Sequence, residues 1–367
     1  MGLKVGQLSI VTMTFFSGQS GRSARSLAGW ATLSLFLIAL GGVFLLPTGF
    51  VIERPGQVFN VMGEINENPV ISSDDLEVYP SESRFDVTTV SLVGNREATP
   101  NWVQVLVAWA DPKQIVLPLD EVYPPNRSTA EIRAESTAQM EISQQDAIAV
   151  ALKELGYEVP RNLYISSVLE GTPASKLLIA GDLVFEAGGV TVSTFEELRS
   201  QIQLSVGQPM VISVIRGGSS VEVEITPEFR DDAYVIGALI GYTYEFPATV
   251  NLQLGDVGGP SGGLMFSLGI IDAFTPGSLA GDNHVAGTGT ISPGGEVGAI
   301  GGIGLKMIAA KDSGATLFLA PYGNCDEVIG AIPSGLSVVA VRDLSEAKSA
   351  VEALATGQSL PALGCTN

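Results

Sequence analysis

GGPSGGLMFSLGIIDAF, residues 258–274, is the stretch that decides the fold of the C-terminal third of this chain. Its glycines allow close backbone approach and unusual dihedral angles, and its proline suits the first turn of a helix. The apolar run that follows predicts a buried helix over residues 263–274. Ser261 is therefore expected at a helix N-terminus, where the backbone N–H groups around Gly259 and Gly262 can hold a developing oxyanion.

A serine nucleophile needs a neighbouring base. Lys306 follows a glycine-rich turn and opens an apolar helix predicted over residues 305–314. Burial and the positive end of a helix dipole both lower the pKa of a lysine, as a neutral base requires. Lys311 stands near the C-terminal end of the same helix, where a charged ammonium is favourable, so it is a poor base. We therefore predict Ser261 as nucleophile and Lys306 as general base.

The alternative is a histidine-dependent hydrolase. The chain has one histidine, His284. A triad would combine it with Ser261 and with Asp256 or Asp282. We interpret His284 as a solvated residue of the polar turn that enters the next strand.

The rest of this region alternates strands with helices. Strands are predicted over residues 284–292, 315–321 and 337–343, and a closing helix over Ser345–Ala355. Residues 232–356 therefore read as one α/β domain, with residues 357–367 as a C-terminal tail.

Residues 160–229 have a different sequence pattern. Short β-branched runs are separated by turns, and one helix, Phe195–Leu204, interrupts them with Thr194 as its predicted N-cap. A small sheet with one covering helix fits this pattern.

Residues 50–158 read as a mixed α/β segment rich in strands. A strand is predicted over residues 87–94, and residues 102–109 form a short apolar run. A helix is predicted over Ser143–Leu155, with Ser143 as its N-cap.

The N-terminus has the pattern of a membrane signal. Lys4, Arg22 and Arg25 precede the uncharged run Leu27–Leu46, which at 1.5 Å per residue spans about 30 Å, the thickness of the hydrocarbon core. We interpret residues 27–47 as an uncleaved signal anchor. The positive-inside rule then puts residues 1–26 in the cytoplasm and the remainder outside it.

Composition excludes other classes of protein. The net charge of −20 argues against a nucleic-acid partner, and two cysteines with one histidine give no zinc-site pattern, so no metal or cofactor is expected. Cys325 and Cys365 fall on the predicted outer side, where disulfides persist. They either form a bridge that ties the tail to the body or are two unrelated thiols.

Two motifs together resemble the proteolytic domain of the Lon family. They are Pro260-Ser261-Gly262-Gly263 and, after Thr288-Gly289-Thr290-Ile291, the run Gly301-Gly302-Ile303-Gly304-Leu305-Lys306. The resemblance implies a Ser261–Lys306 dyad, with the hydroxyl of Thr288 hydrogen-bonded to the lysine amine. Gly258 departs from the family's acidic residue, and Gly262 from its alanine. No Gly-x-x-x-x-Gly-Lys-Ser/Thr loop occurs, so ATP-driven unfolding is not implied.

The run VLEGTPASKLLIAGDLVFEAGGVTV, residues 168–192, resembles a PDZ domain of bacterial proteases. Such domains bind extended peptides by adding a strand to a sheet edge. The groove is expected between the strand at 164–169 and the helix at 195–204. A Gly-Leu-Gly-Phe carboxylate loop is not evident, which leaves open whether C-termini or internal segments are bound. A spacer without a ligand is the alternative.

The whole layout resembles the PDZ-containing, membrane-anchored Lon-like proteases of bacteria, the YlbL type. The likeness implies a multidomain α+β and α/β protein with one transmembrane helix. It also implies an ATP-independent serine endopeptidase that cleaves membrane or envelope proteins outside the cytoplasm, and a homo-oligomer such as a hexamer. The main alternative is a non-catalytic PDZ scaffold or chaperone whose Lon fold is inactive.

Overall fold

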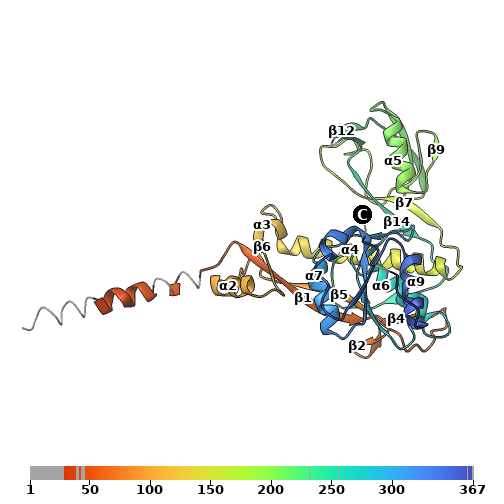
Figure 1. Ribbon diagram of the computed structural model, residues 1–367. Helices are drawn as coiled ribbons and strands as arrows, with labels where there is room; N and C mark the ends of the chain where they lie inside the picture. The colour runs from red at the N-terminus through yellow and green to blue at the C-terminus, as the bar shows by residue number, and fades with distance from the viewer. Residues whose placement is uncertain are drawn as a thin grey trace, which may run out of the picture. The chain divides into compact units, whose positions relative to one another are not determined.

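The computed structural model describes residues 29–38, 41–42, 46–230, 232–255, 257–361 and 363–365 (Figure 1). The chain divides into two compact units, residues 1–54 with 92–128, and residues 55–91 with 129–367. The predicted cytoplasmic tail, residues 1–26, lies outside the described residues, and the predicted anchor, residues 27–47, lies partly outside them. Within the described ranges no helix has the length and apolar character needed to cross a bilayer.

From residue 46 onward, the first unit combines a two-stranded pairing with two short helices. The first half of β1 (Phe50–Asn60) pairs antiparallel with β6 (Ile115–Pro118). The helices are α2 (Trp102–Ala110) and α3 (Leu119–Val122).

The short apolar run at residues 102–109, which lies in a segment expected to be rich in strands, forms the helix α2. The side chain of Asn101 accepts a hydrogen bond from the backbone N–H of Gln104, and the side chain of Gln104 accepts one from the N–H of Asn101. This reciprocal cap satisfies two N–H groups at the helix start. A short apolar run is ambiguous by periodicity alone, so here the cap decides for a helix.

A largely parallel sheet forms the centre of the second unit. Its strand order is β20 (Ser337–Val341), β19 (Leu317–Pro321), β16 (His284–Gly287), β5 (Arg84–Val93) and β1. Strand β16 runs parallel to both β5 and β19, and β19 runs parallel to β20.

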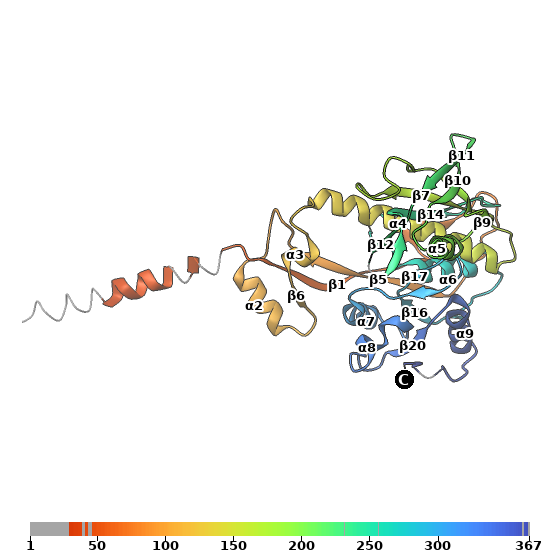
Figure 2. The same cartoon turned by 90° about the horizontal axis from the view of Figure 1, so that it is seen from above.

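Helices cover both faces of this sheet. Alternate strand residues enter two different cores, as the period of two in a strand requires. Val285, Leu317 and Leu319 pack with α4 (Thr129–Glu154), α6 (Gly263–Ala273) and α9 (Leu344–Ala355). Ala286 and Phe318 pack with α7 (Ile303–Asp312) and α8 (Cys325–Val328) on the other face. Figure 2 shows α7 and α8 on the opposite side of β20 from α9.

The predicted helices over 263–274, 305–314 and 345–355 are confirmed within two residues at each end. The predicted strands over 315–321 and 337–343 are confirmed as well. The single strand expected over 284–292 is instead two strands, because strand conformation is interrupted at Thr288-Gly289, between β16 and β17 (Thr290–Ile291). The remaining short elements are β2 (Glu64–Ile65), β3 (Asn68–Pro69), β4 (Ile71–Ser72), β15 (Asn251–Leu252), β18 (Val297–Gly298) and η1 (Tyr322–Asn324).

A second, smaller sheet has its own core. Its order is β11 (Ser219–Ile225), β10 (Met210–Arg216), β8 (Leu183–Ala187), β7 (Arg161–Val168) and β14 (Ala238–Tyr244), with β9 (Val190–Thr191) beside β8. The covering helix α5 (Phe195–Leu204) is capped by Thr194 as predicted, and β12 (Glu228–Arg230) pairs with β13 (Ala233–Val235). Because β14 belongs to this sheet, the domain runs past the predicted boundary at residue 229 to Tyr244.

Helix α4 differs most from its prediction. It spans Thr129–Glu154 and not Ser143–Leu155, so Ser143 lies in the helix interior and is no N-cap. Its C-terminal half buries Ala147, Ala151 and Leu152 in the same core as α6. Residues before the small sheet therefore build the same core as residues after it, and the predicted boundary at 158 does not separate two packed bodies.

The C-terminal tail is tied to the second unit. Cys325 and Cys365 form a disulfide, which confirms the first of the two readings of these residues. Ala340 of β20 donates a backbone hydrogen bond to the carbonyl of Leu363. The tail thus pairs with the edge strand of the main sheet.

Candidate active site

Three side chains meet at the carboxyl end of β16. Lys306 Nζ donates to Ser261 Oγ at 2.8 Å and to Thr288 Oγ1 at 3.0 Å. Ser261 comes from the loop before α6 and Lys306 from the first turn of α7, on opposite faces of the sheet. Because the carboxyl ends of parallel strands are where such helices begin, the sheet brings these two helix starts together around Thr288.

The amine is buried and the hydroxyl is reachable. Lys306 is 3% exposed and Thr288 0% exposed, whereas Ser261 is partly exposed. The Thr288 hydroxyl accepts from Lys306 and donates to the carbonyl oxygen of Ser261 at 3.0 Å. The N–H of Gly289 donates to the same carbonyl at 2.8 Å. The backbone of the serine is therefore fixed from β16 while its side chain faces the lysine.

The glycines after Ser261 are required by close packing. A Cβ on Gly262 would lie 2.8 Å from the ring of Phe266, and a Cβ on Gly263 would lie 2.8 Å from Ile291 Cγ2. Both distances are shorter than ordinary van der Waals contact. The alanine usual at the Gly262 position in the Lon family would need the phenylalanine ring to move.

Helix α4 holds the loop on its N-terminal side. Ser143 Oγ donates to the carbonyl of Pro260 at 2.8 Å, and the N–H of Gly259 donates to the carbonyl of Ser136 at 2.8 Å. The N–H of Gly259 is thereby engaged, so the expectation that it faces an oxyanion is wrong for this conformation. A Cβ on Gly258 would lie 2.3 Å from Ser136 Oγ, which gives a steric reason for glycine where Lon enzymes have an acid.

The start of α7 is held in a similar way. Gly302 has a φ of 69° at the N-cap, a left-handed conformation that favours glycine. Buried Asn324 accepts from the N–H of Ile300 at 2.9 Å and donates to its carbonyl at 2.8 Å. These two hydrogen bonds fix the turn that precedes α7 and thereby the position of Lys306 in the first turn of that helix.

Lys311 lies apart from Ser261. It is in the last turn of α7, and its Nζ donates to the carbonyl of Gly335 at 2.8 Å in an exposed setting. The contrast between the two lysines of α7 that the sequence predicts is therefore present: Lys306 is buried against the serine, and Lys311 is partly exposed at the far end of the helix.

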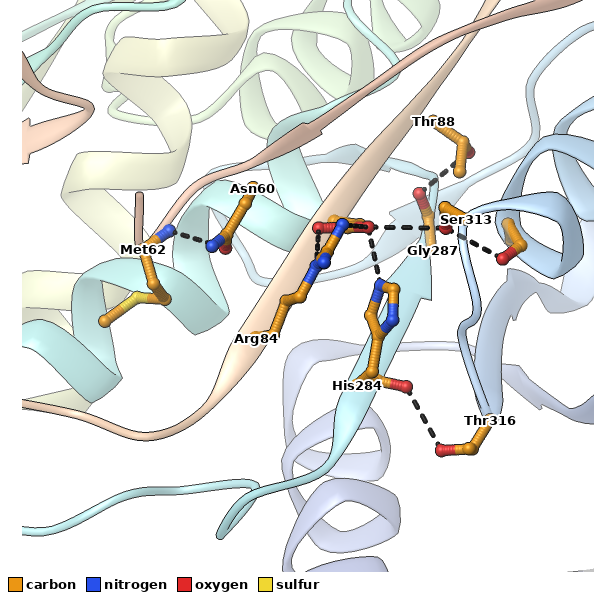
Figure 3. Close-up of polar contacts among 10 residues, drawn as sticks. Asn60, Met62, Arg84, Thr88, His284, Gly287, Ser313 and Thr316 are labelled. Carbon is orange, nitrogen blue, oxygen red and sulfur yellow. Dashed lines mark hydrogen bonds and ion pairs between the residues drawn. The ribbon is translucent and has the colours of Figure 1, made fainter. Parts of the chain in front are cut away.

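His284 belongs to a different cluster. Figure 3 shows its ring and the guanidinium of Arg84 meeting a shared carboxylate, that of Asp86. His284 Nε2 is 2.6 Å from Asp86 Oδ2, and Arg84 makes two 3.0 Å bonds to the two carboxylate oxygens. The hydroxyl of Ser313, at the C-terminal end of α7, reaches the carboxylate at 3.4 Å. Asp86 is fully buried, so these contacts tie β5, β16 and α7 together.

Burial by itself would raise the pKa of Asp86. The hydrogen bonds and charges of His284 and Arg84 outweigh that effect, and the pKa lies below its ordinary value.

The geometry does not support the histidine-dependent alternative. His284 begins β16 and Thr288 follows its end, four residues on, which is about 13 Å along an extended strand. Its ring is engaged with Asp86 and not with Ser261. Of the two acids named for that triad, Asp256 lies outside the described residues. We interpret His284 as a structural residue, partly buried and not in a solvated turn as expected.

The small sheet offers a second site at its edge. The expected groove beside β7 is wrong, because β7 lies between β8 and β14 and has no free edge. Strand β14 is the edge strand on the β7 side of the sheet. Helix α5 lies next to it, because the N–H of Phe195 donates to the hydroxyl of Tyr242 at 2.7 Å. Phe195 and Glu196 of α5 and Ile240 and Tyr242 of β14 are among the residues that line one cavity.

Comparison with known proteins bears first on the segment that contains Ser261 and Lys306. Residues 255–352 match the model of the Lon protease (S16) C-terminal proteolytic domain. This segment is similar to a Lon-type proteolytic domain. It contains Ser261, Thr288 and Lys306, and it supports serine peptidase chemistry in this part of the chain. Lon protease 2 of Bacillus subtilis (strain 168) is 39% identical over 90 residues, which are 24% of this chain and 16% of that protein.

Other similar proteins are PDZ domains and a periplasmic protease. The periplasmic pH-dependent serine endoprotease DegQ of Escherichia coli (strain K12) is 29% identical over 108 residues, 29% of this chain and 24% of that protein. The PDZ domain of an SdrC-like protein from Listeria innocua is 29% identical, with a TM-score of 0.21 over 22% of this chain and 92% of that chain. The PDZ domain of the SdrC-like protein from Listeria monocytogenes is 26% identical, with a TM-score of 0.20, over 21% of this chain and 85% of that chain. The chain spans a quarter or less of the two curated relatives named here.

Proposed function

We propose that the chain is an ATP-independent serine endopeptidase in which Ser261 is the nucleophile and Lys306 the general base. The observation that carries the proposal is the 2.8 Å contact between Lys306 Nζ and Ser261 Oγ. It lies inside the segment that matches the Lon proteolytic domain. Burial disfavours a charged ammonium, which favours the neutral amine that this role needs.

In the proposed reaction the neutral amine of Lys306 takes the proton from Ser261 Oγ. The resulting alkoxide attacks a peptide carbonyl, and the C–N bond of the tetrahedral intermediate then breaks. Lys306, now an ammonium, gives its proton to the leaving amine. Water attacks the acyl-enzyme with Lys306 again as base, and Ser261 regains its proton. Thr288 keeps the amine directed at the serine through the 3.0 Å contact.

The proposal assigns the oxyanion to backbone N–H groups at the very start of α6, with that of the N-cap residue Gly262 among them, and not to the N–H of Leu264, which donates to the carbonyl of Gly289. The first N–H groups of a helix have no partner inside the helix, and they point toward a charge that develops at the residue before it. Gly259 is not assigned to the oxyanion site, because its N–H donates to the carbonyl of Ser136.

We further propose that the small sheet is a PDZ-like domain that receives extended substrate segments along β14. An edge strand offers unpaired main-chain groups to a peptide, and exposed Leu239 and half-buried Ile240 alternate along it. Ile240→Ser is expected to weaken the hydrolysis of long substrates while leaving short peptides unaffected. Equal loss for both lengths, in a variant that keeps the native circular dichroism spectrum, would remove the groove from the proposal.

The proposed location follows from residues 27–47 as a membrane anchor. The proteolytic domain would then lie outside the cytoplasm and act on membrane or envelope proteins, in a homo-oligomer such as a hexamer. Comparing the envelope proteome of cells that carry the unaltered chain with that of Ser261→Ala cells identifies substrates, because only substrates accumulate in the variant. Sedimentation of the purified protein in detergent gives the number of subunits.

Two pairs of variants test the dyad. Ser261→Ala and Lys306→Met should each abolish the hydrolysis of a fluorogenic peptide library, without added nucleotide. Lys311→Met makes the same change at the other end of α7, and His284→Ala removes the competing base, so both variants should stay active. An active Lys306→Met variant, or an inactive unaltered chain that no serine-reactive probe labels, would refute the proposal.

A further inference from the structure

Helix α2 of the first unit exposes a continuous apolar stripe. Val103, Leu106, Val107 and Ala110 follow the spacing of one helix face, and all four are exposed. Val103 is 48%, Leu106 45% and Val107 59% exposed. Isolated exposed apolar residues are normal, but an exposed apolar stripe along a whole helix marks a surface that binds a protein, a membrane or a ligand.

The composition of α2 is unusual for a surface helix. Residues 102–110 contain no charged side chain, and Gln104 is the only polar one. Val105 and Ala108 supply the buried face, so the exposed stripe is a second apolar face and not the back of an amphipathic helix. A helix with apolar side chains on all of its faces is normally buried, either in a protein core or in a membrane.

Two tryptophans border the stripe. Trp102 and Trp109 both contact Phe50, with ring centroids 6.2 and 6.0 Å apart, and Trp109 is nevertheless 56% exposed. Tryptophan is enriched at membrane–water interfaces, where its ring is apolar and its N–H stays near water. The border of α2 therefore suits a lipid headgroup region better than bulk water.

The helix begins where the N-terminal apolar run ends. Pro47 directly follows the run Leu27–Leu46 and forms a β-bridge with Asn101, the N-cap of α2. The next residue, Thr48, donates through both its N–H and its hydroxyl to the carbonyl of Pro100, at 3.1 and 2.8 Å. The start of α2 is thus fixed to the residues by which the chain leaves the apolar run.

We propose that α2 is an interfacial helix. It lies at the membrane–water interface on the non-cytoplasmic side of the bilayer, with Val103, Leu106 and Val107 inserted among the lipids. The inference rests on the proposed membrane anchoring by residues 27–47. If that run spans the bilayer, Pro47 emerges at its surface, and the bonds to Pro100 and Asn101 keep α2 there. At nine residues α2 is about 14 Å long, so all of it stays near that surface.

The size of the stripe favours lipid over a second copy of this chain. Its half-exposed side chains offer on the order of 300 Å², whereas a stable protein interface takes about 800 Å² from each partner. An interfacial helix needs no matching surface, because its apolar face enters the headgroup–acyl boundary to a depth of about 5–10 Å.

The three tryptophans of the chain allow a direct test. The full chain is reconstituted in vesicles with Trp109 as sole tryptophan (Trp30→Phe, Trp102→Phe), and its emission is measured with lipids brominated at different depths. The expected result is a blue-shifted emission that shallow bromines quench more than deep ones. A second chain that keeps only Trp30 reports the anchor in the same assay.

Two matched variants locate the contact on the stripe. Val107→Asp puts a charge at the centre of the stripe and should abolish most of the quenching of Trp109. Gln104→Glu adds the same charge outside the stripe and can keep the reciprocal cap with Asn101, so quenching should persist. Equal effects of the two variants would overturn the inference.

The remaining outcomes separate this inference from the proposed function. Quenching of Trp30 without Trp109 overturns the interfacial helix and leaves the anchor. Absence of quenching from both overturns anchor and helix together. Blue-shifted Trp109 that bromines do not reach means that protein covers the stripe, which also overturns the inference. Peptide hydrolysis is measured in the same vesicles, and Ser261→Ala should abolish it without changing the quenching.

Discussion

Replacing Thr288 by valine removes one hydroxyl from the centre of the site and changes little else. The two side chains have nearly the same shape, and both suit extended backbone. Thr288 is fully buried, so no water replaces the lost oxygen. The hydroxyl accepts from Lys306 Nζ and donates to the Ser261 carbonyl, each at 3.0 Å.

The structure sets the expected magnitude. Each lost hydrogen bond takes away about 0.5–1.5 kcal/mol, and a stranded buried partner adds to that. Neither partner is stranded here, because the Ser261 carbonyl keeps the N–H of Gly289 and Lys306 keeps Ser261 Oγ. We expect Thr288→Val to lower the free energy of unfolding by about 1–2 kcal/mol. A similar loss in positioning the amine slows peptide hydrolysis about 5- to 30-fold.

Thr88→Val is the matched control. Thr88 is also fully buried, and its hydroxyl donates to the carbonyl of Gly287 at 3.0 Å, the residue just before Thr288. Urea unfolding should show comparable destabilisation for both variants, whereas kcat for a fluorogenic peptide should fall only for Thr288→Val. Equal kcat values for the two variants would refute a positioning role for Thr288.

Three further predictions concern the frame around the site. Asp86→Asn should destabilise the protein by about 3 kcal/mol, because it breaks a buried cluster. Since the folded pKa of Asp86 is lowered, its stabilisation is present above the unfolded value of about 4 and is lost as pH falls through the folded pKa, so the variant should flatten the acid limb of stability against pH. Cys365→Ser opens the bridge to Cys325 across 40 residues and should lower stability by up to about 4 kcal/mol; reductant should do the same to the unaltered chain and nothing to the variant. Gly258→Ala should be destabilising by about 1–3 kcal/mol through its contact with Ser136 Oγ, and Ser136→Ala should relieve it; additive effects would contradict that contact.

The dyad residues could be found in the sequence because their signals are local. Glycine and proline before an apolar run identify a helix start wherever the chain later places it. Ser261 and Lys306 both stand at such starts, and a parallel sheet brings helix starts to one edge. Predicting two helix N-termini was therefore nearly enough to predict that the two side chains meet.

The supporting residues could not be found because their partners are distant in the chain. Ser143 reads as an N-cap from its neighbours, yet its hydroxyl binds a carbonyl 117 residues later. The edge strand β14 was missed for a similar reason: it follows an apparent domain boundary at residue 229 and returns to pair with β7. Local patterns report helix and strand character, but they do not report which strand is left at an edge.

The bond between Ser143 and Pro260 has a consequence for the order in which the protein is built. Helix α4 leaves the ribosome first, the small sheet next, and the loop that carries Ser261 last. The small sheet starts at Arg161 and ends at Tyr244, and these two residues are paired neighbours across β7 and β14. Once folded, the insert holds its two ends together, so α4 meets the serine loop as though a short turn joined them. In a nascent chain the bond between Ser143 and Pro260 therefore forms only after the whole small sheet has been made.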